Sequence, residues 1–310
     1  MRSECPFCRS YERFKPHVAR EMMFGLRKEF QYRECNDCGS VWLADDITAQ
    51  ELGEYYGPGY YSYARRRDTS LHQWMLNRRD RAELGEFSLI GRVMAARWPN
   101  TTIRMIGGLG LSKKARILDV GCGGGRLLDR LKGIGFTNLR GVDPFVEEDQ
   151  VSQDGVAITK GHLADLREDF DLIMFNHSLE HVMDPIGELV VAREHLMPGG
   201  KCLVRIPTVS SHAWEYYGID WVQLDAPRHI AIPSRTGMAK GANLAGFQLV
   251  DTIDDSTSFQ FEGSERYRAN VPLLNHDFPI VAQDRARFTR DSASLNAQGR
   301  GDQVGFVLTL

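Results

Sequence analysis

Two histidines and one glutamate lie within five residues in the segment HSLEH, which runs from His177 to His181. The spacing H-x-x-E-H occurs in zinc proteases, and imidazoles and carboxylates also bind other divalent cations or transfer protons. A protease would need this segment on a helix and a third ligand downstream. Instead it follows FDLIMFN, an apolar run that predicts a buried strand, and the next helix is expected only near Asp184. A protease is therefore disfavoured, which leaves a cation site of His177, Glu180 and His181, or a role for Glu180 and His181 at the mouth of a ligand pocket.

Four of the six cysteines form two C-x-x-C pairs near the start of the chain, in CPFC and CNDC. Each pair is typical of a knuckle that points two thiolates at one ion, and four sulfurs make a closed tetrahedral Zn²⁺ site. Such a site has no open position, so its expected role is structural. ERFKPHVA and EFQYREC, between the pairs, predict two strands. The alternative is four unrelated cysteines. The predicted zinc ligands are Cys5, Cys8, Cys35 and Cys38.

The composition is that of a soluble globular protein. The chain has 310 residues, of which 42% are hydrophobic and 25% charged, and its formal net charge is −3. This charge argues against nucleic-acid binding by the molecule as a whole. No apolar run is long enough for a transmembrane helix, and the N-terminus lacks the apolar core of a signal peptide. We therefore expect a cytoplasmic protein whose cysteines bind metal or stay free.

The chain is expected to divide into three parts: a zinc ribbon over residues 1–45, a connector with a helical segment over 46–98, and an α/β domain over 99–310. The connector is rich in tyrosine (ELGEYYGPGYYSY), and apolar residues recur at helical spacing over 64–98. This helical segment is also basic. We interpret its arginines as a solvated face, with a phosphate-binding edge as the alternative: Arg65, Arg66, Arg67, Arg78, Arg79 and Arg81.

From residue 115 onward, predicted strands alternate with predicted helices. Strands are indicated in ARILDVGC, LRGVDP, VAITKG, FDLIMFN, KCLVRIP, FQLVDTID and QVGFVLTL. Helices are indicated in GRLLDRLKGIG, DPIGELVVAREHLMPGG and SRTGMAKGANLAGF. This alternation predicts an α/β fold with a mostly parallel sheet.

A glycine-rich loop, LDVGCGGG, joins the first of these strands to a helix, where backbone N–H groups can meet a ligand. A dehydrogenase pattern fails, because the third glycine position after Gly121 and Gly123 holds Arg126. Asp119 would repel a pyrophosphate but attract a cationic amino group. Asp143, at the end of the next strand, can bind both hydroxyls of a ribose. S-adenosylmethionine, with a ribose, a sulfonium and an ammonium, fits these groups.

Residues 116–310 resemble class I S-adenosylmethionine-dependent methyltransferases in several motifs. ILDVGCGGG looks like their first motif, GVDP like the acidic second, FDLIMFNHSLEHVMDP like the fourth-strand motif and LMPGGKCLVRIP like the fifth. QVGFVLTL resembles their antiparallel last strand. The N-terminal part resembles the zinc ribbon of bacterial methyltransferases that act on sugars or polysaccharide precursors. The resemblance implies a Rossmann-like, mostly parallel sheet with an antiparallel last strand and a small four-cysteine ribbon.

The resemblance also implies which residues bind the cofactor. Asp119, Gly121 and Gly123 would hold its methionine part, and Asp143 its ribose. The loop GHLADL would cover the adenine, and Asn176 would close the methionine side. In that loop His162 replaces the acid usual in the family, and Leu163 would offer backbone contacts.

Methyl transfer to an alcohol or carbon acid requires removal of a proton, for which histidine is suited. Residues 207–233 form a long aromatic segment expected to be a substrate lid, and its end, DAPRHI, resembles the place where zinc-bearing sugar methyltransferases carry a histidine base. We predict His229 as the base, against a structural histidine that anchors the loop. His181 is the second candidate. Arg228 would suit a phosphate or carboxylate on the substrate.

The predicted function is methyl transfer to a small molecule, such as a sugar or polysaccharide precursor, including nucleotide-linked sugars. One alternative is an RNA methyltransferase that binds phosphates through the ribbon and the arginines of residues 65–81. The net charge of −3 disfavours this alternative. Another is a non-catalytic cofactor-binding protein. The fold alone does not choose the acceptor.

Overall fold

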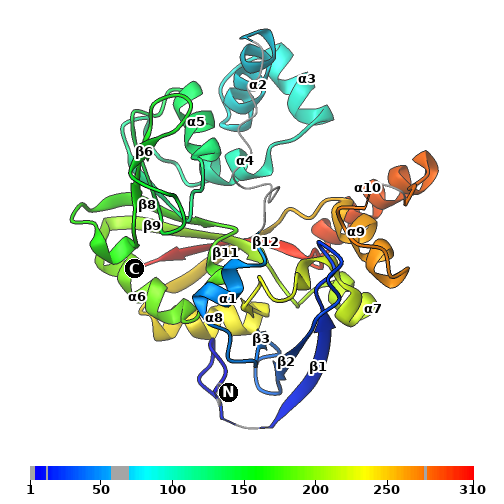
Figure 1. Cartoon of the computed structure of the whole chain (residues 1–310). Helices are drawn as coiled ribbons and strands as arrows, with labels where there is room; N and C mark the ends of the chain where they lie inside the picture. Colours follow the sequence, from blue (N-terminus) through cyan, green and yellow to red (C-terminus); the bar gives the residue numbers. More distant parts are fainter. Residues whose placement is uncertain (1–3, 12, 57–69, 276–277) are drawn as a thin grey trace. The chain divides into compact units, whose positions relative to one another are not determined.

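The computed structural model describes residues 4–11, 13–56, 70–275 and 278–310 (Figure 1). The chain divides into two compact units. Unit 1 comprises residues 1–57, 177–190 and 204–308, and unit 2 comprises 58–176, 191–203 and 309–310. Part of the predicted tyrosine-rich connector and the arginines at 65–67 lie outside the described residues. Within the described ranges, no helix has the length and apolar character needed to cross a membrane.

Unit 2 contains the predicted parallel sheet. Its strands are β4 (Arg116–Val120), β5 (Asn138–Asp143), β6 (Gln150–Val151), β7 (Ala157–Lys160), β8 (Phe170–Asn176) and the first part of β9 (Leu196–Pro207), in the order β9-β8-β4-β5-β7-β6. Strand β4 is parallel to β5 and β8, with Ile117 opposite Leu139 and Leu172, and β5 is parallel to β7. The short β6 is antiparallel to its neighbour β7. The predicted mostly parallel sheet is confirmed.

Continuous apolar runs place β4 and β8 in the middle of this sheet. Ile117 and Leu118 in β4 are completely buried, as are Leu172 and Ile173 in β8. Strands covered on both faces lack the alternation of half-exposed strands, so an unbroken apolar run is typical of them. Helix α5 (Arg126–Gly133) follows β4 and packs through Leu128 and Leu131.

The helical segment predicted over 64–98 is two helices in its described part. Helix α2 (Ser70–Glu83) ends before Gly85, whose φ of +86° stops the helix. Helix α3 (Leu89–Arg97) begins after Ser88, whose side chain accepts a hydrogen bond from the amide of Gly91. Helix α4 (Thr101–Gly108), which the sequence did not predict, completes this part of unit 2.

Unit 1 is built on a four-stranded antiparallel sheet in the order β1-β2-β3-β10. The two strands predicted between the cysteine pairs are β1 (Phe14–Arg20) and β2 (Glu29–Cys35), and β3 (Val41–Leu43) follows. The fourth strand, β10 (Ala231–Ile232), comes from a distant part of the sequence and begins two residues after His229. The cysteine-rich ribbon is therefore joined by backbone pairing to the segment that carries this histidine.

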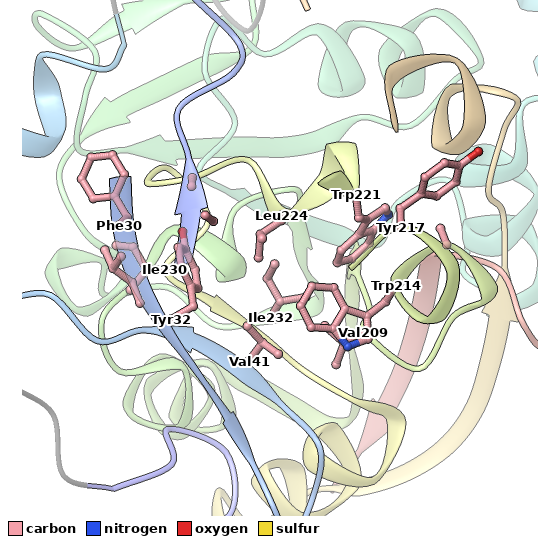
Figure 2. Packing of buried hydrophobic residues seen from close by; sticks show 14 of the residues in the cluster. Phe30, Tyr32, Val41, Val209, Trp214, Tyr217, Trp221, Leu224, Ile230 and Ile232 are labelled. Carbon is pink, nitrogen blue, oxygen red and sulfur yellow. The ribbon is translucent and has the colours of Figure 1, made fainter. Parts of the chain in front are cut away.

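The aromatic segment over 207–233 is more regular than the sequence indicates. It contains helix α7 (His212–Tyr217), two turns of 3₁₀-helix (Gly218–Asp220 and Val222–Leu224) and β10. Trp221 and Leu224 are buried in a core shared with Val41 of the ribbon sheet, and Figure 2 shows these side chains within one cluster. The aromatic residues thus supply the core of unit 1, which explains why the segment is rich in them.

The remaining elements include several that the sequence predicted, namely α6 (Pro185–Glu194), α8 (Arg235–Leu244), β11 (Gln248–Asp254) and β12 (Gln303–Thr309). The unit 1 part of the large sheet has the order β11-β12-β9. Like α4, three more helices in the described part of the chain were not predicted: α1 (Ala49–Gly53), α9 (Phe259–Arg268) and α10 (Ala282–Ala297).

The loop before α5 gives a test of this packing. Gly125 has a φ of +77°, and a Cβ there would lie 2.8 Å from Ile158 Cδ1 and 2.9 Å from Ser152 Cβ. Gly125→Ala should therefore lower the free energy of unfolding by about 1–3 kcal/mol, measured by urea denaturation. Gly124→Ala is the matched control, because a Cβ there meets nothing within 4 Å. Equal losses in the two variants would contradict the packing described here.

Candidate functional site

The carboxyl ends of the parallel strands in unit 2 bring together the residues predicted to bind a cofactor. Gly121 and Gly123 adopt positive φ angles of 72° and 53°, which turn the chain sharply after β4. The amide of Gly123 donates to Asp143 Oδ2 at 2.7 Å, and the amide of Phe145 donates to Asp143 Oδ1 at 2.8 Å. Asp143 therefore fixes the glycine loop against the end of β5. Each carboxylate oxygen keeps a second lone pair that can accept from a ligand hydroxyl.

Asp119 is the residue of this loop whose charge is least satisfied. It is 3% exposed, and no described residue donates a hydrogen bond to its Oδ1. Burial, with a smaller effect of neighbouring Asp143, raises the pKa of Asp119 to about 8. A buried carboxyl group in this condition favours a ligand that brings a positive charge or hydrogen-bond donors. The ammonium group of S-adenosylmethionine has both, so the residues present fit that cofactor.

The other predicted cofactor residues lie at the same edge of the unit 2 sheet. His162 is exposed just after β7, and its backbone amide donates to Asp165 Oδ2 at 2.7 Å. Leu163 is buried, so its side chain anchors the loop while its backbone stays near the edge. Asn176 is the last residue of β8 and is half-buried. The contacts of these residues with the cofactor stay predictions.

A second group of chemically active residues lies in unit 1. Glu180, His181 and His229 each offer a side-chain ligand atom within 4.8 Å of the others. Glu180 has no exposed surface, and the rings of His181 and His229 meet edge to face with centroids 4.9 Å apart. Residues 180–181 and 229 are far apart in sequence. The structure thus brings together both predicted catalytic histidines and adds a carboxylate between them.

Backbone carbonyls orient both imidazoles. His229 Nδ1 lies 2.6 Å from the carbonyl oxygen of Gln223, and His181 Nδ1 lies 2.8 Å from that of Arg228. A carbonyl only accepts, so each Nδ1 carries the hydrogen, and in the neutral ring Nε2 keeps its lone pair. Nε2 is therefore the atom of each ring that can take a proton or bind a cation.

Glu180 stays ionised in spite of its burial. Burial raises the pKa of this carboxyl group, but His177, His181 and His229 together lower it to about 2. His177 Nδ1 lies 3.4 Å from Glu180 Oε1 and His229 Nε2 lies 4.0 Å from it, so neither makes a hydrogen bond of normal length. Burial lowers the pKa of His181, which favours its neutral, proton-accepting form. The cluster combines a buried negative charge with two imidazoles whose Nε2 atoms can take a proton or bind a cation.

His177 has a different role from the one considered in the sequence. Its Nε2 lies 2.6 Å from Arg205 Nη1, and Arg205 also donates to Asp255 at 2.7 Å. Arginine only donates, so the lone pair of His177 Nε2 is already used. The triad within ligand distance contains His229 in place of His177. Sequence spacing missed this, because only the tertiary fold brings residue 229 to residue 180.

The interpretation of Arg228 as a substrate contact is wrong. Its side chain has no exposed surface and donates to Glu21 at 3.0 Å, to Asp225 Oδ2 at 2.9 Å and to the carbonyl of Tyr55 at 3.1 Å. Burial lowers the pKa of Arg228, but Asp225 and Glu21 raise it by a larger amount. With its charge compensated inside the protein, Arg228 supports the loop, and its carbonyl holds His181.

The four cysteines predicted to bind zinc lie together in unit 1. Cys5 Sγ is 3.6 Å from Cys38 Sγ, Cys8 Sγ is 3.6 Å from Cys35 Sγ, and all four lie within 4.8 Å of one another. These sulfur separations exceed a disulfide bond and suit four ligands around one ion. A hydrogen bond from Cys5 is the main effect that lowers the pKa of Cys38, so this pair readily holds a thiolate. The donor set fits a structural Zn²⁺.

The ribbon contacts the histidine loop directly. Val41 and Trp42 of β3 pair with Ile232 and Ala231 of β10. The hydroxyl of Tyr32 donates to the carbonyl of His229 at 2.9 Å. The position of His229 therefore depends on the strands that the cysteines hold together.

Comparison with known proteins agrees with this arrangement of the glycine loop. A family model described as a methyltransferase domain matches residues 93–252, which is more than half of the chain. The chain belongs to this methyltransferase family. This membership confirms the fold class and the enzyme class predicted from the motifs.

Individual relatives cover less of the chain. The ubiquinone biosynthesis O-methyltransferase of Cereibacter sphaeroides is 34% identical over 125 residues, which are 36% of this chain and 50% of that protein. The chain thus spans about half the length of the curated relatives it matches. An S-adenosylmethionine-dependent methyltransferase from Mesorhizobium loti has a TM-score of 0.44 at 16% identity, covering 67% of this chain and 97% of that one. A complex of the Haloferax volcanii Trm112 activator with a putative methyltransferase has a TM-score of 0.47 at 18% identity. The match covers 79% of this chain and 99% of that one.

The buried carboxyl group of Asp119 predicts an unusual pH dependence of stability. Between the ordinary pKa of 3.8 and about 8, the folded chain keeps a proton that the unfolded chain has lost, so the free energy of unfolding falls as pH rises. Asp119→Asn should remove this fall and raise the free energy of unfolding at pH 7 by about 1–3 kcal/mol, while abolishing cofactor binding. Urea denaturation at pH 5 and pH 7 measures the first effect, and calorimetry with S-adenosylmethionine measures the second. Glu148→Gln, at an exposed position, is the control; an unchanged pH slope in Asp119→Asn would refute the assignment.

The link between the ribbon and His229 predicts a second result. Cys38→Ser should prevent zinc from binding at the four cysteines and should speed hydrogen exchange of the amides of residues 229–232 and 234, because β3 would no longer hold β10 firmly. Exchange in β4 should stay slow. Elemental analysis and hydrogen-exchange mass spectrometry measure these changes. Cys122→Ser, outside the four-cysteine group, should still bind zinc, and unchanged exchange at residues 229–232 and 234 in zinc-free Cys38→Ser would contradict the link.

Proposed function

We propose that this chain transfers a methyl group from S-adenosylmethionine to a small-molecule acceptor. The observation that carries the proposal is the buried, uncompensated carboxyl group of Asp119 at the glycine loop of a methyltransferase-family chain. When bound, the cofactor supplies an electrophilic methyl group on a sulfonium. Asp119 would bind its ammonium group, Asp143 its ribose hydroxyls, and the amides of the glycine loop its carboxylate. The loop at His162 and Leu163 would cover the adenine, with Asn176 beside the methionine.

We further propose that the pair His181 and His229 provides the base. In both rings Nδ1 donates its hydrogen to a backbone carbonyl. The lone pair of Nε2 is therefore available to remove the proton from the acceptor. The ionised Glu180 would stabilise the imidazolium that forms, as an acid partner does in other histidine bases. His229 is more deeply buried than His181, so His181 is placed better to meet the acceptor and His229 to share the proton.

The acceptor we propose is a hydroxyl of a sugar or polysaccharide precursor, on the resemblance of the N-terminal ribbon to that of sugar methyltransferases. The relatives named as ubiquinone biosynthesis O-methyltransferases support oxygen as the acceptor atom. They also make a phenolic acceptor the alternative to a sugar.

The proposal predicts a separation of turnover from cofactor affinity. His229→Ala and His181→Ala should each lower turnover about 10²- to 10⁴-fold, while the Kd for S-adenosylmethionine changes by no more than about twofold. His229→Gln, whose amide can still donate to the Gln223 carbonyl, separates loss of the base from loss of the loop anchor. Turnover is followed as S-adenosylhomocysteine release with nucleotide-linked sugars and with catechols. Release with catechols alone would replace the sugar acceptor, and full turnover in both alanine variants would refute the histidine base.

A second candidate is a cation-assisted transfer, which the close approach of Glu180, His181 and His229 favours. Their two imidazoles and one carboxylate match the donors of common divalent-metal sites, and both rings have the backbone partner that metal-ligating histidines usually have. Elemental analysis separates the two readings. One metal per chain, lost in Cys38→Ser, supports the base alone. A second metal, lost in His181→Ala but not in Cys38→Ser, supports the cation.

A further inference from the structure

The outer side of helices α2 and α3 in unit 2 carries a large group of exposed apolar side chains. In α2 Leu71, Trp74 and Met75 recur at helical spacing and are exposed, and in α3 Leu89, Ile90 and Val93 do the same. Phe87, between the helices, and Trp98, just after α3, are also exposed. Each member of this group other than Trp74 and Met75 is at least 55% exposed. We call this surface the α2–α3 face.

Ion pairs hold three carboxylates of this helix pair, and two of the three are buried. Asp80 is completely buried and pairs with Arg130 and Arg79, and Glu83 pairs with Arg104 at 2.7 Å. Glu86 pairs with Lys113 at 2.9 Å. The inner side of the pair is thus held by ion pairs, while the apolar residues point outward.

Exposed arginines accompany the apolar residues on this face. Arg78 lies over the ring of Trp74 at 4.9 Å, Arg92 over Phe87 at 5.4 Å and Arg97 over Trp98 at 5.8 Å. Arg81 joins Arg78 in lining a hollow of about 310 Å³, whose other walls include Trp74, Phe87 and Glu86, the last of which is paired with Lys113. Two guanidinium groups beside two aromatic rings form a place for one anionic group with an apolar tail.

We infer that the α2–α3 face binds the surface of a membrane that contains anionic phospholipids. Aromatic and aliphatic side chains with arginines among them are typical of protein surfaces that lie in the interfacial region, where apolar groups enter the acyl boundary and guanidinium groups bind phosphates. An RNA surface would use the arginines and aromatic rings, but it gains little from exposed Leu89, Ile90 and Val93. The positive charge of the face favours an anionic partner over a second copy of the same face, which would bring like charges together. Such binding rests on the surface of two short helices and does not depend on the proposed methyl transfer.

Sedimentation of the full chain with lipid vesicles tests the inference. We expect binding to vesicles of equimolar phosphatidylglycerol and phosphatidylcholine, and at least tenfold weaker binding to phosphatidylcholine alone. Ile90→Gln with Val93→Gln should weaken binding about tenfold or more, because two aliphatic side chains no longer enter the lipid. Arg78→Gln and Arg81→Gln should each weaken it about fivefold, and high salt should reduce this contribution.

Leu244→Gln is the matched control, since Leu244 is an exposed leucine of α8 in unit 1. It should leave vesicle binding unchanged, and circular dichroism should show that all variants stay folded. No binding to anionic vesicles, or equal binding by the Ile90→Gln/Val93→Gln variant, overturns the inference. Binding of single-stranded RNA in place of vesicles would assign the face to nucleic acid. A dimer that the same double substitution dissociates, without vesicle binding, would assign it to a second copy of the chain.

Discussion

The ion pairs of Arg228 with Glu21 and Asp225 are the interaction on which the histidine cluster of unit 1 depends. A guanidinium group without exposed surface is tolerated only where carboxylates balance its charge and acceptors satisfy its N–H groups. Glu21 follows β1 and Asp225 precedes β10, so the pairs join the ribbon to the loop that ends in His229. The carbonyl of Arg228 in turn receives the Nδ1 hydrogen of His181. Arg228 thereby holds the His181 imidazole through its carbonyl and anchors the loop that carries His229.

The same rule distinguishes supporting residues from residues poised to bind. Arg228 has partners for its charge inside the protein, and it acts as a support. In the described part of the chain, Glu180 pairs with His177 at 3.4 Å and with His229 at 4.0 Å, and burial together with Asp143 raises the pKa of Asp119. Groups of this kind lower the stability of the free protein. A ligand that supplies the missing charge stabilises the folded state when it binds. Incomplete compensation at Asp119 and Glu180 therefore indicates function more specifically than burial alone.

The elements that depend on local pattern were predictable from the sequence. Unbroken apolar runs predicted β4 and β8, the glycines predicted the turn before α5, and the paired cysteines predicted neighbouring thiols. The elements that depend on distant contacts were not. Pairing of β10 with β3 joins residues 231–232 to residues 41–42, and this long-range pairing helps to bring His229 next to the ribbon. The role of Arg228 was misjudged for a related reason, since its neighbours Glu21 and Tyr55 are distant in sequence.

Helices α2 and α3 show a different limit of sequence patterns. Periodicity identifies an apolar side of a helix, but it does not determine whether that side faces the core or the solvent. In α2 the side that faces inward is determined by Asp80 and Glu83. Their ion-pair partners, Arg130 and Arg104, lie on neighbouring elements of unit 2. Because two ion pairs need these carboxylates inside, the residues on the opposite side, Leu71, Trp74 and Met75, are turned outward. The exposed apolar surface is thus a consequence of how the polar residues are paired, and large exposed apolar surfaces are typical of interaction sites.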